Sequence, residues 1–256
     1  MTRRLADEGA IFLLAVQFLT RLPLPIGPAY SPARMASTPR WLPAVGALIG
    51  TFAAAVFWFA ASVFPPALAA LLSTVATLLL TGALHEDGFA DTCDGLGARA
   101  SRERALEIMR DSRLGTWGAA GLGLILGAKI LSLAALPPDT TPIVLIAGHA
   151  ASRASAVLVI ATSNYVRDEG TGKPVAAGVC SGGLAVALAT GALAVAATAW
   201  VLPFAAVAGG IGGLILGHGV MRLAFERRLG GYTGDCLGAV QQTSETCLYL
   251  GVLACL

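Results

Sequence analysis

The sequence predicts an all-α protein: a polytopic transmembrane helical bundle of about six or seven membrane spans. Of its 256 residues, 56% are hydrophobic and only 12% are charged, and the mean hydropathy is +0.75. Its apolar runs reach the length of about 20 residues that a helix needs to cross a bilayer core of about 30 Å. We therefore expect a single integral membrane domain over residues 1–256. The net charge of +2 follows from membrane topology and gives no sign of nucleic-acid binding.

Seven apolar segments are candidate spans, and the last is the weakest because Gln241, Gln242 and Glu245 interrupt it. They cover about 42–64, 66–84, 117–136, 142–162, 182–202, 203–222 and 237–255. An earlier apolar segment, residues 9–25, is too short to span comfortably. It suits an interfacial or re-entrant helix.

Basic residues indicate how the bundle is oriented, because Lys and Arg remain on the cytoplasmic side of short loops. They gather before the first span and in three polar segments, which we predict to be cytoplasmic: about 85–116, 163–181 and 223–236. Within the spans, Lys129 and Arg153 should face the bundle interior or extend towards an anion, since charge is costly in lipid. Either could pair with Glu245.

An acidic stretch follows the second span, with four carboxylates between Glu86 and Asp94. On a helix, Asp87, Asp91 and Asp94 fall at i, i+4 and i+7 and share one face. Three like charges on one stripe repel each other, and hard oxygen ligands select Mg²⁺, Mn²⁺ or Ca²⁺. We interpret the stripe as a metal-diphosphate site. The alternative is a solvated acidic cap at the end of a membrane helix.

A short amphipathic helix with Ser101 as its N-cap should follow and end near Arg110, Asp111 and Arg113. Asp111 would add a metal ligand, and the two arginines would clamp phosphate oxygens. The alternative is an exposed, salt-bridged helix.

A Gly-rich turn into another helix begins at Leu229. Its backbone N–H groups and the positive helix end form a candidate anion site, with Thr233 and Gly234 in the turn and Asp235 as a further possible metal ligand. His85 could support a ligand, bind the metal or act as a base. His149 and His218 lie within spans and are more simply interior residues.

Four motifs in order resemble those of the cobalamin synthase family, the adenosylcobinamide-GDP ribazoletransferases. They are Phe18-Leu19-Thr20-Arg21-Leu22-Pro23, His85-x-Asp87-Gly88-x-x-Asp91-Thr92-x-Asp94-Gly95, Glu107-Ile108-Met109-Arg110-Asp111-Ser112-Arg113-Leu114-Gly115 and Gly230-Gly231-x-Thr233-Gly234-Asp235-x-Leu237-Gly238-Ala239. The resemblance covers essentially the whole chain. It implies an Mg²⁺-dependent inner-membrane enzyme of late vitamin B12 biosynthesis. Such an enzyme joins adenosylcobinamide-GDP to α-ribazole or its 5'-phosphate, releasing GMP and forming adenosylcobalamin or its phosphate.

The resemblance and the residues together give a set of expected roles. One or two Mg²⁺ would be held by Asp87, Asp91 and Asp94, with Asp111 or Asp235 as further candidates. The catalytic set is His85, Asp87, Asp91, Asp94, Arg110, Asp111 and Arg113, and the substrate-binding set is Arg21, Lys129, Arg153, Thr233, Gly234 and Asp235. The base remains open between His85 and one of the aspartates, and Glu86 is left out because the motif does not fix it. The bilayer is the expected environment, and the oligomeric state is open.

Three other functions share part of this pattern. A CDP-alcohol phosphotransferase signature begins as Asp94-Gly95-Leu96-Gly97-Ala98-Arg99 does, but Ile108, Ser112 and Thr116 stand where it needs a Gly and two Asp. An intramembrane prenyltransferase needs a second aspartate stripe, for which Asp235 is a poor match. A transporter could use Lys129, Arg153, His149 and Glu245 at mid-membrane, but it does not need a metal-binding stripe outside the bilayer.

Overall fold

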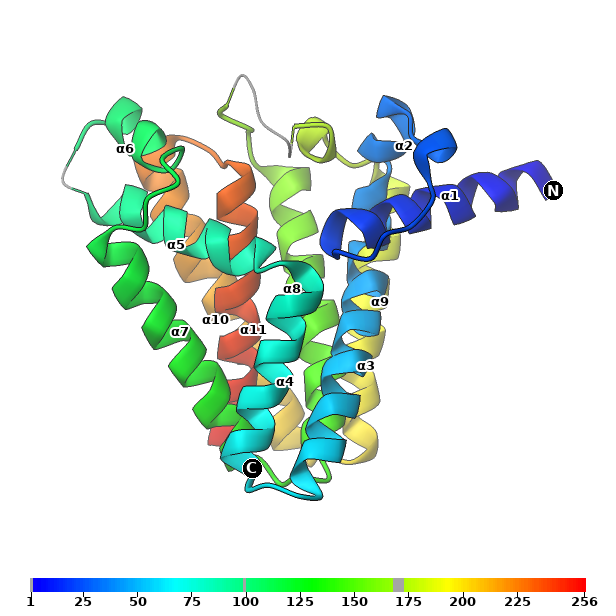
Figure 1. Cartoon of the computed structure of the whole chain (residues 1–256), viewed down its shortest axis with the longest axis vertical. Helices are drawn as coiled ribbons and strands as arrows, with labels where there is room; N and C mark the ends of the chain where they lie inside the picture. The colour runs from blue at the N-terminus through cyan, green and yellow to red at the C-terminus, as the bar shows by residue number, and fades with distance from the viewer. Residues whose placement is uncertain (1, 99, 168–172) are drawn as a thin grey trace.

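The computed structural model describes residues 2–98, 100–167 and 173–256, and within these ranges the regular structure is helical throughout, with no strand. The α-helices are α1 (Thr2–Leu19), α2 (Pro32–Ala36), α3 (Leu42–Ala61), α4 (Pro66–Thr81), α5 (Leu84–Gly97), α6 (Arg102–Ile108), α7 (Thr116–Ala135), α8 (Thr141–Thr162), α9 (Ser181–Ala197), α10 (Phe204–Leu229) and α11 (Gly234–Ala254). The predicted all-α bundle is therefore confirmed (Figure 1).

The chain is a multi-pass membrane protein, although fewer helices qualify as spans than the seven expected. Among the described residues, five helical stretches are long and apolar enough to cross a bilayer: Thr38–Ala61, Thr116–Ala135, Thr141–Thr162, Ser181–Trp200 and Phe204–Leu229. Helices α4 and α5 together make a sixth at most. Helix α4 has only 16 residues, and α11 does not qualify although it has 21. The polar side chains of α11 lower its hydropathy.

Helix α11 lies in the middle of the bundle, in contact with α5, α7, α8 and α10 (Figure 1). Its closest partner is α10, where glycines allow the two backbones to approach. A Cβ atom added at Gly213 would collide with the carbonyl oxygen of Cys247, and one at Gly217 would lie 2.7 Å from that of Thr243. The Gly-rich segment of α10 therefore serves close helix packing.

A sharp corner separates α4 from α5. Gly82 and Ala83 both adopt left-handed backbone conformations, with φ of 67° and 58°, and the two helix axes differ by 92°. A left-handed residue ends an α-helix, and for Ala83 this conformation is strained. The expected span 66–84 consequently stops at Thr81, and α5 runs across the end of the bundle (Figure 1).

Helix α1 crosses the same end of the bundle at a steep angle to α3 (Figure 1). Its orientation agrees with the interfacial helix expected over 9–25, but its bounds differ: it begins at Thr2 and ends at Leu19. The backbone N–H of Arg21 donates to the carbonyl of Leu80 at 2.8 Å and ties the end of α1 to the α4–α5 corner.

A buried polar network joins α11 to its neighbours. The Nζ atom of Lys129 lies 2.9 Å from Oε1 of Glu245 and donates to Oε1 of Gln242 at 2.7 Å. Oε2 of Glu245 lies 3.3 Å from Nδ1 of His149, and Gln242 donates to Glu86 at 2.8 Å. All five side chains are buried. The expectation that Glu245 would find a cationic partner is confirmed, and that partner is Lys129.

We expect Gly213→Leu to destabilise the protein by about 1–3 kcal/mol or more, because the new side chain overpacks the α10–α11 contact. Gly212→Leu is the matched control, since nothing lies within 4 Å of a Cβ at Gly212. Thermal unfolding of the purified protein in detergent measures the difference. Equal unfolding temperatures for the two variants would contradict the assigned packing.

We expect Lys129→Met to lower the free energy of unfolding by about 3–5 kcal/mol, because it leaves the carboxylate of Glu245 buried beside a methyl group. The double variant Lys129→Met/Glu245→Gln should recover most of that loss, since no stranded charge remains. Free energies of unfolding in a common detergent test both statements. A double variant as unstable as Lys129→Met alone would show that charge pairing is not the cause.

Candidate active site

A cavity of about 200 Å³ lies where α5, α8 and α11 meet beneath the end of α1. Five of the predicted site residues line it: His85, Asp87, Arg153, Gly234 and Asp235. The hydrophobic part of its wall includes Phe18 and Leu19, Leu42, Ala156 and Leu237. The N-terminal, acidic and Gly-rich motifs therefore meet around one cavity.

Two glycines bring α5 against the start of α11. A Cβ atom at Gly88 would lie 2.9 Å from Cα of Asp235, and one at Gly238 would lie 2.8 Å from the carbonyl oxygen of His85. Larger residues at either position would push the helices apart. This close crossing places Asp235, from the far end of the sequence, beside the aspartates of α5.

The surroundings of Asp91 at this crossing raise its proton affinity. Burial, followed by the negative charges of Asp235 and Asp87, raises the pKa of Asp91 to about 7. A cation placed among these groups would favour the ionised form of Asp91 and lower its pKa again. The cluster therefore has the electrostatic character of a cation site.

Arg167 is a site residue that sequence reasoning missed. Its Nη1 atom lies 2.8 Å from Oδ2 of Asp235. The contact depends on two backbone hydrogen bonds between distant loops: Val166 donates to Tyr232 at 3.0 Å, and Tyr232 donates to Asn164 at 2.9 Å. In the sequence, Arg167 differs in no way from other positive loop residues, so no local signal could have identified it.

The predicted turn into a helix start at Thr233 is confirmed. The hydroxyl oxygen of Thr233 accepts the backbone N–H of Cys236 at 3.4 Å and donates to Oδ2 of Asp235 at 3.3 Å. Thr233 is fully buried and does not line the cavity. Its role in the structure is to cap α11 and orient Asp235.

Asp94 has a different environment from that expected for a metal ligand. Its two carboxylate oxygens accept the backbone N–H groups of Gly115 and Gly118, each at 2.8 Å, at the start of α7. A Cβ atom at either glycine would collide with this carboxylate. Asp94 is therefore the cap that fixes α7 against α5.

Arg110, Asp111 and Arg113 are not brought into the cavity. Asp111 and Arg113 pair with each other, with Nε of Arg113 at 3.0 Å from both carboxylate oxygens. This pairing lowers the pKa of Asp111 to about 2. Arg110 is exposed just after α6. The predicted N-cap, Ser101, does accept the backbone N–H of Arg104, at 3.3 Å.

Three further basic residues were expected to bind substrate, and only one reaches the cavity. Arg21 is exposed and packs over Gly82, where a Cβ atom would collide with its side chain. Lys129 lies in the interior network. Arg153 lines the cavity, its Nη1 donating to the carbonyl of His149 at 2.9 Å, and its buried Nε has no hydrogen-bond partner among the described residues.

The side chains of the described residues include no group of three or more His, Cys, Asp or Glu that already converges on one metal position. The carboxylates of Asp87, Asp91 and Asp235 nevertheless supply the hard oxygen donors that Mg²⁺ prefers. Mg²⁺ is commonly held by one or two carboxylates, with waters and substrate phosphates completing its shell. The residues present fit this mode of binding.

Comparison with known proteins identifies the family. The model of the cobalamin-5-phosphate synthase family matches residues 11–253. Three relatives, each named adenosylcobinamide-GDP ribazoletransferase, are 46%, 42% and 40% identical and come from Leptothrix cholodnii, Ralstonia pickettii and Vibrio cholerae. The matches cover 98%, 94% and 95% of this chain and 97%, 93% and 93% of the relatives. No solved structure matches. The resemblance seen in the motifs is confirmed, and the chain belongs to the cobalamin-5-phosphate synthase family.

Proposed function

We propose that this chain transfers the adenosylcobinamide phosphate group from adenosylcobinamide-GDP to α-ribazole or its 5'-phosphate, releasing GMP. Family membership and the names of its relatives support this activity. The observation that carries the chemistry is the cavity in which Asp87 and Asp235 lie with Arg153. This cavity combines the guanidinium of Arg153, which can bind phosphate oxygens, with carboxylates that can bind a metal ion.

In the reaction, an oxygen of the acceptor's ribose forms a new bond to the phosphorus that carries the cobinamide. The bond from that phosphorus to the bridging oxygen breaks, and GMP leaves with the electron pair. The hydroxyl proton passes to a base. Phosphoryl transfer of this kind needs precise positioning and neutralisation of the spread negative charge.

Arg153 is the cation that we assign to the diphosphate. Its side chain is 2% exposed, and it is anchored on α8 by the carbonyl of His149. Because its guanidinium lies in a site that excludes most water, a hydrogen bond to a phosphate oxygen there would be stronger than one at the surface. His85 and Asp87 line the same cavity, and either can accept the proton.

We propose that Mg²⁺ is bound by one or two carboxylates drawn from Asp87, Asp91 and Asp235, together with the diphosphate. When bound, the ion supplies charge neutralisation at the transferred phosphoryl group. Asp235 is favoured over Asp94 and Asp111 because it lines the cavity and they do not. Backbone amides and Arg113 hold the carboxylates of Asp94 and Asp111 outside the cavity. The raised pKa of Asp91 supports the placement of a cation in this cluster.

We propose an inner-membrane location with the cavity facing the cytoplasm. The loops rich in arginine lie at the same end of the bundle as α5, and positive loops remain cytoplasmic. A transport pathway has less support, because Lys129, His149 and Glu245 contact one another in the buried interior.

Asp91→Asn should reduce turnover by about 100-fold or more, since it removes charge from the cation cluster. Asp139→Asn, at an exposed acid in the loop between α7 and α8, should leave turnover unchanged. GMP release from adenosylcobinamide-GDP and α-ribazole measures both. As a second readout, Mg²⁺ should raise the unfolding temperature of the wild type more than that of Asp91→Asn. Near-normal turnover of Asp91→Asn at saturating Mg²⁺ would overturn the metal assignment.

Arg153→Met should lower kcat/KM by about 100-fold, through loss of a buried charge-assisted hydrogen bond. Arg153→Lys should recover part of the loss by restoring the charge without the guanidinium geometry. Arg104→Met, at an exposed arginine of α6, is the control. Steady-state kinetics on folded protein measure kcat/KM for each variant. If Arg153→Met and Arg153→Lys behave like the wild type, Arg153 does not contact the diphosphate.

A further inference from the structure

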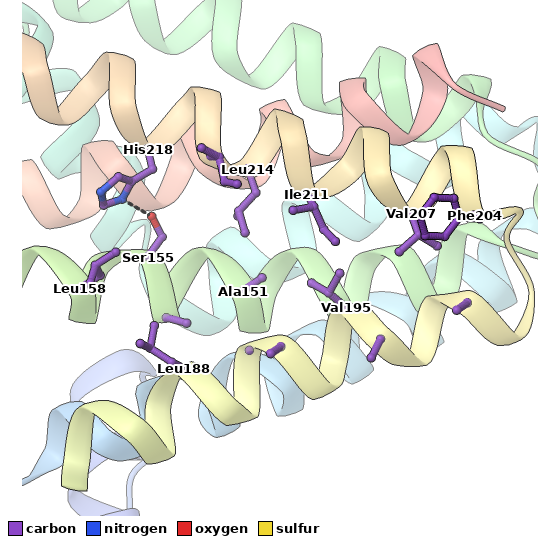
Figure 2. Close-up of a pocket in the computed structure, with 16 residues that line it drawn as sticks. Ala151, Ser155, Leu158, Leu188, Val195, Phe204, Val207, Ile211, Leu214 and His218 are labelled. Atoms are coloured by element: carbon purple, nitrogen blue, oxygen red, sulfur yellow. Dashed lines mark hydrogen bonds between the residues drawn. The ribbon is translucent and has the colours of Figure 1, made fainter. Parts of the chain in front are cut away.

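A second cavity, of about 730 Å³, lies between α8, α9 and α10 and shares no lining residue with the active-site cavity. Figure 2 shows Leu188 and Val195 of α9 facing α10 across it, with Ile211 and Leu214 on the α10 side. The walls are almost entirely apolar, and Ile211 and Ile215, midway along α10, are 41% and 65% exposed. The cavity is thus a groove that opens sideways from the bundle, towards the bilayer.

The few polar groups along this groove already bond to one another. The hydroxyl of Ser155 lies 2.7 Å from Nδ1 of His218 and 3.0 Å from the hydroxyl of Ser244 (Figure 2 shows the contact with His218). Satisfied polar groups make no demand for a polar ligand. The occupant of the groove itself should therefore be hydrocarbon.

The groove leads to a polar pocket one helical turn further along both walls. On α8, Leu158 lines the groove and Thr162 lines the pocket; on α10, His218 lines the groove and Arg222 lines the pocket. Residues four apart share a helix face, so the two spaces follow the same seam. The polar pocket has a volume of about 330 Å³ and is lined by Thr162, Ser163, Asn164, Arg222, Glu226, Gly230 and Gly231.

The polar pocket contains one positively charged side chain, Arg222, and one negatively charged side chain, Glu226. Nε of Arg222 donates to Oε1 of Glu226 at 3.0 Å, and its two terminal nitrogens donate to Thr162 at 2.8 and 3.1 Å. These bonds use three of the five N–H donors of the guanidinium within the described part of the chain. The remaining donors suit a phosphate, and the carboxylate of Glu226 suits an ammonium group.

We propose that this seam binds one membrane phospholipid with a phosphoethanolamine head group. An acyl chain would fill the groove between α8, α9 and α10, the phosphate would accept from Arg222, and the ammonium would donate to Glu226. The pocket lies at the C-terminal ends of α8 and α10. These ends are at the side of the bundle where the polar loops gather (Figure 1), where we expect the lipid head groups to lie. A purely anionic head group is disfavoured because Glu226 repels it.

A second copy of the chain fits this surface less well. Symmetric dimers place the same patch of both subunits against each other, so the interface must be complementary to itself. Two concave grooves facing each other would enclose a void. A lipid acyl chain can enter the groove from the side and fill it, so no void is left.

The tail site can be tested by filling the groove. Ala196→Phe should place a ring in it, because Ala196 lines the groove, whereas Leu193→Phe, at a 71% exposed position of α9 outside the groove, is the matched control. Each protein is reconstituted in nanodiscs of equal phosphatidylethanolamine and phosphatidylglycerol, released into detergent and weighed by native mass spectrometry. Retained phosphatidylethanolamine should fall about tenfold in Ala196→Phe and not in Leu193→Phe.

The head-group site is tested with Arg222→Gln, with Arg227→Gln at an exposed arginine of the same helix as its control. Arg222→Gln should lower the retained phosphatidylethanolamine about tenfold, because the lipid phosphate loses its donor, and Arg227→Gln should leave the retained amount unchanged. All four variants should retain GMP release, which separates this site from the transferase cavity. Equal retention by Ala196→Phe and Leu193→Phe, a wild-type preference for phosphatidylglycerol, or a dimer that Ala196→Phe dissociates would each overturn the proposal.

Discussion

The fold depends on an ion pair that has no access to water. Lys129 of α7 and Glu245 of α11 meet at 2.9 Å, and Gln242 joins them while also reaching Glu86 of α5. Removing either charge would leave the other stranded in an interior of low dielectric constant. The network therefore fixes how α11 sits among α5, α7 and α8, and the cavity is built on that placement.

Two local backbone features create the site at the end of this bundle. The left-handed pair Gly82 and Ala83 turns α5 across the end of the bundle, and Gly88 and Gly238 let α5 cross α11 at close range. Without the corner, the acidic helix would continue along α4. Without the glycines, Asp235 could not stand beside the aspartates of α5.

The same bundle separates two chemical environments. Charged and polar groups of α5, α8 and α11 surround the small cavity, whereas the groove between α8, α9 and α10 is apolar and opens sideways. Helix α8 contributes to both: Arg153 faces the first and Ser155 the second. Because the two share no lining residue, a lipid bound in the groove need not obstruct the transferase reaction.

The sequence by itself determined the helical membrane architecture, the family and the acidic helix, because hydropathy, charge distribution and motif spacing are local properties of the chain. It also predicted that Glu245 would need a cationic partner, because a charge buried within a span must be paired. Only the tertiary structure decided which aspartates gather. It assigned Asp94 to the start of α7, paired Asp111 with Arg113 and brought Asp235 and Arg167 to the site. These contacts depend on a helix corner, a glycine crossing and a bridge between distant loops, and none of these leaves a periodic signal in the sequence.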